Sequence, residues 1–152
     1  MKKKIVYIGL TAETIHHGHI NLIEKARIYG DIVVGLLTDT AVANFKRIPL
    51  LSYDQRKKII TNIKGVTKVI PQNEWDYSIN LKKIKPDYMV HGSDWVSGPQ
   101  KKLKINALKA LHKVGGKLIE IPYTKGVSST ALSMEQSKKF TTPELRLKKL
   151  NR

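Results

Sequence analysis

The sequence has no cysteine and few acidic or aromatic residues, and each shortage excludes a class of protein. Without cysteine there is no disulfide framework and no thiolate metal site. Aromatic residues make up only 7% of the chain, and it shows neither the aromatic pattern of RNA-binding modules nor their G-x-x-G clamp. No apolar run approaches the roughly 20 residues of a membrane span. Gly9 interrupts the apolar stretch near the N-terminus and no signal cleavage site follows, so we expect a cytoplasmic protein without a membrane partner.

The charge is strongly one-sided. The 28 basic residues outnumber the 12 acidic ones and give a net charge of +16. Such a charge attracts polyanions, but the lysines are scattered, which is more typical of a solvated surface than of a nucleic-acid interface. A small, highly charged anion such as a nucleoside triphosphate would benefit from the same field. We therefore expect a small anionic partner and consider nucleic acid unlikely, although a basic nucleotide- or RNA-binding module stays open as the non-enzymatic alternative.

Strand-like and helix-like segments alternate along the 152 residues. This alternation predicts one α/β domain with a doubly wound, Rossmann-like, five-stranded parallel sheet. In such sheets ligands bind beyond the carboxyl ends of the strands. We assign residues 1–135 to this domain and 136–152 to a basic C-terminal helix or tail. The expected strands are residues 4–10, 31–39, 67–71 (ended by Pro71), 87–92 and 117–122, and the expected helices are residues 19–30, 52–65, 78–85, 100–116 and 128–140.

A histidine pair follows the first expected strand. His16 and His19 are three residues apart at a helix start and therefore share a face. Gly18 between them lets a ligand approach the backbone, and a helix N-terminus favours an anion. Two histidines could also bind a metal, but the remaining histidines complete no recognised zinc ligand spacing. Neither the dinucleotide fingerprint G-x-G-x-x-G nor the P-loop G-x-x-x-x-G-K is present. Either histidine alone could simply cap or pack, but for the pair with its glycine we favour phosphate binding, and we take His16 and His19 as the candidate catalytic residues.

Two further segments offer groups for phosphates. Lys46 and Arg47 follow the second strand and are candidates to hold phosphate groups, with Lys46 the candidate catalytic residue; the alternative is solvated loop charge. Ser128, Ser129 and Thr130 stand at a predicted helix start, where hydroxyls and backbone N–H groups could cradle phosphates or simply cap the helix. We expect Mg²⁺ because it bridges phosphate oxygens, but no carboxylate pair identifies itself as its cage.

Together these motifs resemble a known family. The H-x-G-H segment at 16–19 resembles that of the cytidylyltransferase branch of the HIGH-motif nucleotidyltransferases. "LLTD" ends at Asp39, "VHGSDW" (90–95) resembles the G-D-D-W segment of glycerol-phosphate cytidylyltransferases, and "TKGVSSTAL" (124–132) resembles their T-E-G-I-S-T-T segment. The resemblance covers about residues 4–132. It implies a Rossmann-like homodimer that transfers CMP from CTP and releases pyrophosphate; an adenylyltransferase on the same scaffold is the alternative.

A finer resemblance concerns the acceptor. The segments "VYIGLTAETIHHGHINLI", "FKRIPLLSYDQRKKIITNIKGV" and "DYSINLKKIKPDYMVHGSDW" are similar to those of cytidylyltransferases of phosphonate biosynthesis, whose acceptor is 2-aminoethylphosphonate. The alternative is an acceptor of the glycerol-3-phosphate or phosphocholine type. Ser93 stands where the first acid of G-D-D-W usually is, and Tyr123 and Lys125 replace the usual arginine and acid of R-T-E-G-I-S.

The resemblance also implies site residues. Asp94 could accept a hydrogen bond from the cytosine amino group. An ammonium group on the acceptor calls for a carboxylate or an aromatic face. The loop at 73–80 could supply both; the alternative is that it is an ordinary connecting loop. The implied nucleotide-binding residues are Gly9, Leu10 and Thr11 through their backbone, with Gly18, Asp39, Arg56, His91, Gly92, Asp94, Thr124, Ser128, Ser129 and Thr130, and the acceptor-binding candidates are Arg47, Trp75, Asp76 and Tyr77.

Overall fold

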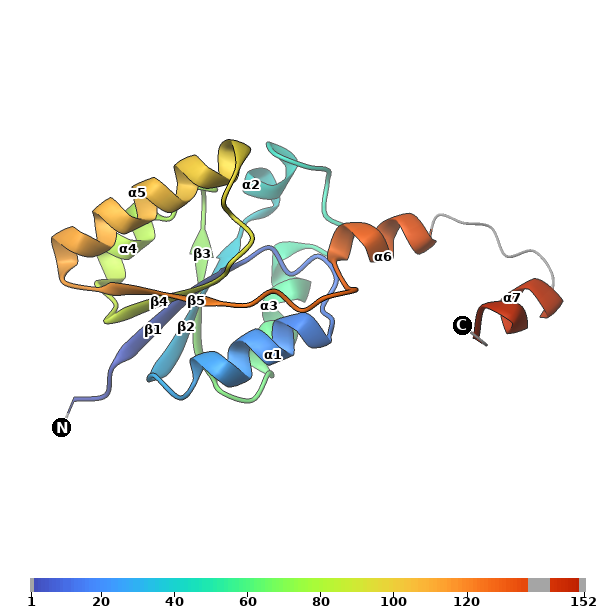
Figure 1. Ribbon diagram of the computed structural model, residues 1–152, viewed down its shortest axis with the longest axis horizontal. Coiled ribbons are helices and arrows are strands. Elements are labelled where there is room, and N and C mark those ends of the chain that lie inside the picture. The colour runs from blue at the N-terminus through green and yellow to red at the C-terminus, as the bar shows by residue number, and fades with distance from the viewer. Residues whose placement is uncertain (1, 137–142, 151–152) are drawn as a thin grey trace.

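Five parallel strands form one sheet in the order β3-β2-β1-β4-β5. The computed structural model describes residues 2–136 and 143–150. The chain builds outward from β1 to β3, then crosses back to place β4 and β5 on the other side of β1, as Figure 1 shows. This confirms the predicted Rossmann-like fold. The strands are β1 (Ile5–Leu10), β2 (Asp31–Leu37), β3 (Val66–Gln72), β4 (Tyr88–Gly92) and β5 (Lys117–Ile121).

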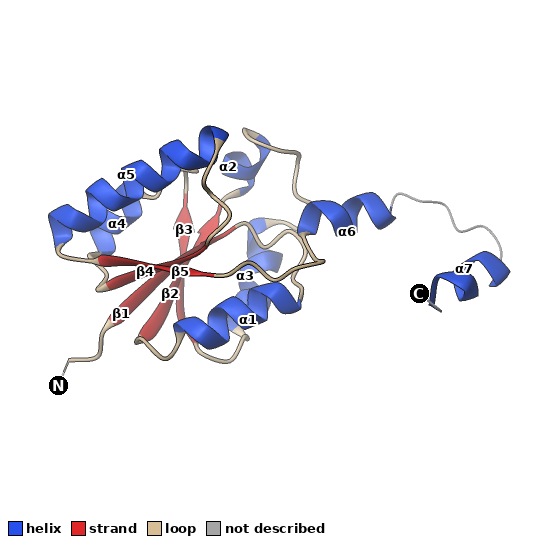
Figure 2. Ribbon diagram, viewed as in Figure 1, coloured by secondary structure: helices blue, strands red, loops and turns tan. Residues whose placement is uncertain are grey.

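Helices cover both faces of the sheet. In Figure 2, α1 and α3 lie on one face and α4 and α5 on the other, whereas α6 extends away from the sheet beyond β5. None of the described helices is long and apolar enough to cross a membrane. The helices are α1 (His17–Ala26), α2 (Asp39–Ala43), α3 (Tyr53–Thr61), α4 (Ser78–Ile84), α5 (Gly98–Val114), α6 (Ser129–Gln136) and α7 (Pro143–Leu150).

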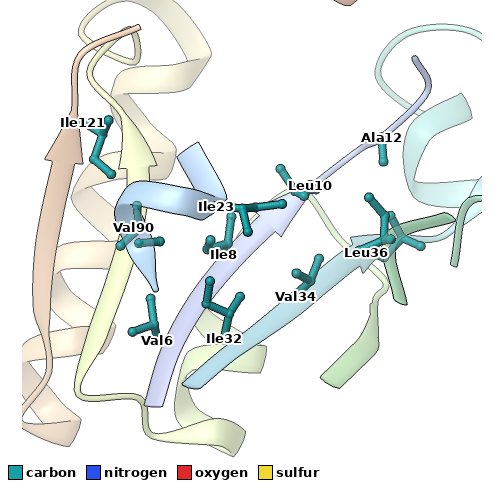
Figure 3. Packing of buried hydrophobic residues seen from close by; sticks show 12 residues of the cluster. Val6, Ile8, Leu10, Ala12, Ile23, Ile32, Val34, Leu36, Val90 and Ile121 are labelled. Carbon is teal, nitrogen blue, oxygen red and sulfur yellow. The ribbon is translucent and has the colours of Figure 1, made fainter. Parts of the chain in front are cut away.

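The two faces of the central strands explain this layering, because successive side chains of a strand point to opposite sides. Val6 and Ile8 of β1 pack with Ile23 of α1 in one apolar cluster, drawn in Figure 3. Tyr7, between them, belongs to a second cluster with Leu111 of α5. Strands buried on both faces read as continuous apolar runs, which is why β1 and β2 were recognisable from the sequence.

The ends of β2 and β3 differ from the sequence prediction for reasons that the structure shows. Strand β2 ends at Leu37, because the Thr38 hydroxyl accepts a hydrogen bond from Ala41 N and begins the short helix α2, which the sequence did not predict. Strand β3 continues through Pro71 to Gln72; an edge strand tolerates proline. The predicted last helix extended to residue 140, and residues 137–140 lie outside the described part of the chain. The proposed division at residue 135 stays a prediction.

Candidate active site

A cavity of about 340 Å³ opens where β1, β4 and β5 end, at the crossover between β1 and β4. This is the position at which open parallel sheets bind ligands. Most of the predicted site residues line it. They are Gly9, Leu10, Thr11, His16, Gly18, His19, Lys46, Trp75, Tyr77, His91, Gly92, Asp94, Thr124, Ser128, Ser129 and Thr130. Asp39, Arg47, Arg56 and Asp76 are not among the lining residues.

His16 and His19 form a reciprocal cap at the start of α1. The Gly18 N–H donates to His16 Nδ1 at 3.0 Å, and the His16 N–H donates to His19 Nδ1 at 3.2 Å. A ring nitrogen that accepts carries no proton, so these partners assign the proton of each neutral ring to Nε2. The ring centroids are 4.0 Å apart. The capping pattern therefore leaves two neighbouring Nε2–H donors for a ligand.

Both imidazoles are biased toward the neutral form. Burial, followed by the neighbouring His16, lowers the pKa of His19 to about 4. Burial, followed by His17, also lowers the pKa of His16. Because desolvation disfavours the charged form, the rings are neutral donors near pH 7 in the free protein. An added Cβ on Gly18 would lie 2.8 Å from the His16 ring, so glycine lets the ring fold back onto the helix start.

The start of α6 closes the cavity beside α1. Ser128 caps α6 by accepting from Ala131 N at 3.0 Å, and the Ser129 hydroxyl donates to the Thr14 carbonyl at 3.2 Å. Asn21 of α1 donates to the Thr124 hydroxyl at 3.4 Å. The first N–H groups of a helix have no partner within it and suit an anion. This arrangement places a second set of donors near the histidine pair.

Three packed rings form the wall on the β4 side: His91 and Trp95 are stacked, and Tyr77 meets both edge-on. His91 lies flat on Trp95, with centroids 3.6 Å apart and planes 5° apart. Its Nδ1 is 2.7 Å from the Gly92 carbonyl and its Nε2 is 3.3 Å from the Tyr77 hydroxyl. A carbonyl only accepts, so Nδ1 carries the proton and Nε2 accepts from Tyr77. Burial lowers the pKa of His91, although the Gly92 hydrogen bond opposes this. Both ring nitrogens of His91 are therefore occupied by the protein.

Lys46 and Trp75 lie together at the β2 and β3 side of the cavity. The Lys46 ammonium is 5.4 Å from the centroid of the Trp75 ring, within the range of a cation–π contact. The Trp75 indole N–H donates to the Ala41 carbonyl at 2.7 Å, which ties α2 to the loop after β3. These contacts bring a cation and an aromatic face to the same end of the site.

Glu13 is a site residue that the sequence reasoning missed. Its side chain is 5% exposed, lines the cavity and receives a hydrogen bond from the Arg47 guanidinium at 3.2 Å. Arg47 thus reaches the site through Glu13. An available signal was the position of Glu13, three residues before His16 in a chain that is poor in acids. A carboxylate buried in such a wall needs a cationic partner.

Three predicted ligands are held by the protein itself. The Arg56 side chain is fully buried and donates to Asp39, whose other carboxylate oxygen accepts from Tyr53 N. Asp76 accepts from Ser78 N and from the Asn106 amide. Burial alone would raise the pKa of Asp76, but these hydrogen bonds hold it below its usual value. The hydrogen bonds of Arg56, Asp39 and Asp76 therefore indicate that these side chains hold the fold together rather than contact a ligand directly.

The described residues contain no group of three histidine, aspartate, glutamate or cysteine side chains arranged to hold a metal ion. Mg²⁺ prefers six oxygen ligands and keeps several waters, with phosphate oxygens often completing its shell. Any Mg²⁺ that enters with a triphosphate would therefore take most of its ligands from the nucleotide and from water.

Comparison with known proteins gives consistent matches. A family model described as cytidylyltransferase-like matches residues 7–134. The chain is 34% identical over 137 residues to the glycerol-3-phosphate cytidylyltransferase of Bacillus spizizenii, covering 89% of this chain and 98% of that protein. It is 32% identical over 124 residues to the ethanolamine-phosphate cytidylyltransferase of Mus musculus, covering 79% of this chain and 29% of that protein.

A solved structure shows the same fold. The lipopolysaccharide core biosynthesis protein from Thermoplasma volcanium GSS1 matches with a TM-score of 0.69 and 23% identity, covering 82% of this chain and 100% of that chain. At this identity the likeness concerns the arrangement of strands and helices alone.

Proposed function

The chain belongs to the cytidylyltransferase-like family, and we propose that it transfers CMP from CTP to a small aminoalkylphosphonate, with 2-aminoethylphosphonate as the best candidate. As a cytidylyltransferase-type nucleotidyltransferase it is an enzyme, which sets aside a basic binding module without turnover. The proposal concerns the acceptor and the roles of the individual residues.

In the proposed reaction, a phosphonate oxygen attacks the α-phosphorus of CTP in line with the bond to the β-phosphate. A new P–O bond forms, the bond to the bridging oxygen breaks, and its electron pair leaves with pyrophosphate. No strong general base is needed, because the nucleophile is already charged; a phosphate monoester has a second pKa of about 6. Catalysis then consists of alignment and charge neutralisation.

The histidine pair is placed for this task. His16 and His19 would donate Nε2–H to oxygens of the α-phosphate and to the bridging oxygen as charge accumulates there. The start of α6, with Ser128, Ser129 and Thr130, would receive the β- and γ-phosphates. Bound Mg²⁺ would withdraw further charge from the leaving group. His91, Gly92 and Asp94 would face the nucleoside from the other wall.

The neighbourhood of Glu13 is the single observation that carries the choice of a zwitterionic acceptor. Glu13 offers a buried carboxylate in the same cavity as the Lys46 ammonium and the Trp75 ring, and it holds Arg47 beside the site. A zwitterion suits this pattern, because its ammonium can pair with Glu13 while its phosphonate pairs with Lys46 and Arg47. Glycerol 3-phosphate has no cation to offer a buried carboxylate.

A phosphorylated amino alcohol is the second candidate, because it carries the same pair of charges. Its support is the 32% identity to a protein named as an ethanolamine-phosphate cytidylyltransferase. The first candidate keeps its place because of the three segments that resemble phosphonate enzymes, which include the loop with Glu13.

Pyrophosphate release tests the proposal directly. We expect the purified protein with CTP and Mg²⁺ to turn over 2-aminoethylphosphonate faster than ethanolamine phosphate, and glycerol 3-phosphate slowest. Glu13→Gln should raise KM for the two amines by about tenfold, the scale of one charged hydrogen bond, and change KM for glycerol 3-phosphate by a clearly smaller factor, since that acceptor feels only the altered Arg47. Glu24→Gln, at an exposed acid of α1, is the matched control.

Two results would contradict the proposal. Turnover with ATP as fast as with CTP across this set of acceptors would contradict the choice of CTP as the nucleotide donor. A preference for glycerol 3-phosphate, together with an unchanged KM for the two amine acceptors in Glu13→Gln, would contradict the proposed aminoalkylphosphonate acceptor. The expected homodimer stays a prediction, which sedimentation equilibrium of the purified chain would test.

A further inference from the structure

Arg56 of α3 is hydrogen-bonded to three stretches of the chain, around Thr11, at 37–39 and at Leu51. Its Nε donates to the Leu51 carbonyl at 3.1 Å, and Nη1 donates to the carbonyls of Thr11 and Leu37 at 2.7 and 2.8 Å. Its Nη2 donates to Asp39 Oδ1 at 2.7 Å. Four of its five N–H donors are therefore used. Because the side chain is fully buried, it has no surface with which to contact a substrate.

The first connected segment contains a strained bend. Ala12 has φ +56°, a left-handed conformation that residues with a side chain rarely adopt. Such a residue keeps this conformation only where its surroundings hold it. Arg56 grips the carbonyl of Thr11, immediately before the bend, and Glu13 follows immediately after it, in the cavity wall. The contact to Thr11 therefore lies next to the turn that brings Glu13 to the cavity wall.

The second connected segment is the 44–51 connection, which carries Lys46 and Arg47. It leaves α2, whose first residue is Asp39, and it ends at Leu51 before α3. Arg56 holds Leu51 at the end of this stretch and Asp39 at the start of the helix that precedes it. The guanidinium carbon lies 5.9 Å from the centroid of the Tyr53 ring. One buried side chain therefore anchors the chain on both sides of the two cationic residues at that end of the cavity.

We propose that Arg56 is a positioning residue for the acceptor: through Thr11 on one side and Asp39 and Leu51 on the other, it sets Glu13 against Lys46 and Arg47. This role rests on the proposed function, because it assumes that these three residues receive the acceptor. Lysine cannot replace it, since one ammonium on a flexible stem cannot serve four acceptors in the fixed fork of a guanidinium. The histidine pair and the start of α6 are on elements that Arg56 does not contact through these bonds.

A positioning role for the acceptor predicts that a change at Arg56 weakens binding of the aminophosphonate more than binding of CTP. Arg56→Lys should raise KM for the aminophosphonate by about tenfold or more, while the thermal shift caused by CTP without acceptor changes little. A merely structural loss would weaken both substrates alike. Arg27→Lys, the same change at an exposed arginine after α1, should match the wild type.

Asp39→Asn provides a second variant if Arg56→Lys does not fold. It keeps the shape of the side chain but removes the charge opposite Arg56, and should shift the acceptor KM in the same direction by a smaller factor. Hydrogen exchange should rise in residues 10–14 and 44–51 of either variant, and stay unchanged in α1 beyond residue 20.

Two further results would distinguish failure of the positioning role from failure of the proposed function. An unchanged acceptor KM, or equal losses for CTP and acceptor, in whichever variant folds would overturn the positioning role while the wild type still turns over. If the wild type releases no pyrophosphate from CTP with any amine acceptor, the proposed function fails instead.

Discussion

The two walls of the cavity use histidine in opposite ways. On the α1 wall, His16 and His19 accept backbone N–H groups at Nδ1, and neither Nε2–H group has a hydrogen-bond partner among the residues that the structure describes. On the β4 wall, His91 donates from Nδ1 to the Gly92 carbonyl and accepts from Tyr77 at Nε2. Burial lowers the pKa of all three. The difference lies in the partner at each nitrogen, so it decides which imidazole offers a donor to a ligand.

The walls also differ in how tightly they are packed. Trp95 is fully buried, and Tyr77 and His91 pack against it. His16 and His19 are half-buried at a helix start. Under the proposed function, the α1 wall would neutralise the charge of the phosphates, and the β4 wall would be a rigid surface for the nucleoside.

The histidine pair should give the largest effect. His16→Asn and His19→Asn should each lower kcat by about 10² to 10³, the usual loss on removing one donor to a developing charge. Asparagine retains a capping oxygen for the helix start, so stability should change less than activity. Steady-state kinetics with CTP measures this, with the exposed neighbour His17→Asn as control. A loss below tenfold would show that Nε2–H is not the essential donor.

Alanine substitutions at Gly9 and Gly18 should affect stability and activity to different degrees. An added Cβ on Gly9 would lie 2.3 Å from Cε1 of the buried Tyr77, so Gly9→Ala should cost about 1–3 kcal/mol of unfolding free energy. On Gly18 it would meet the His16 ring at 2.8 Å, and that half-buried ring has room to move. Gly18→Ala should therefore lose activity with a smaller loss of stability. Urea unfolding and kinetics of both variants would show whether this order is reversed.

The β4 wall should give a smaller kinetic effect. His91→Phe keeps the stack on Trp95 but removes both hydrogen bonds, and should raise KM for CTP by about threefold to tenfold, with a smaller change in kcat. His112→Phe, on the exposed end of α5, is the matched control. A fall in kcat as large as that of His16→Asn would contradict the contrast between the walls.

The pH dependence of stability should give the smallest effect. In the unfolded chain His19 has its ordinary pKa of 6.5, whereas burial in the folded protein lowers this pKa to about 4. Between these values the unfolded state takes up more protons, so stability is fully present above about 6.5 and is lost as pH falls toward 4. His19→Asn should reduce the resulting fall in Tm by about 2–4 °C. Thermal unfolding from pH 7 to pH 4.5 would measure it, and an unchanged slope would count against a neutral His19.

Much of the fold could be predicted because its signals are local. The apolar runs of β1 and β2 and the capping box of Ser52 and Gln55 each lie within a few residues, and the structure contains all three. Helix α2 escaped prediction because it has only five residues and depends on one cap at Thr38. The same limit applied to the site: Glu13 carries no periodic signal, and its partner Arg47 is 34 residues away.

The sequence alone determined the parallel sheet and the pairing of His16 with His19. The alternation of strand and helix segments and the helical spacing of the two histidines are both patterns that can be read within a few residues. The tertiary structure alone decided that Arg56 is sealed behind the cavity, that Glu13 faces it, and that His91 has no free nitrogen. Those outcomes depend on hydrogen bonds between residues 14 to 45 positions apart. The close packing of the sheet and its helices brings such groups together, and nothing in their local spacing records it.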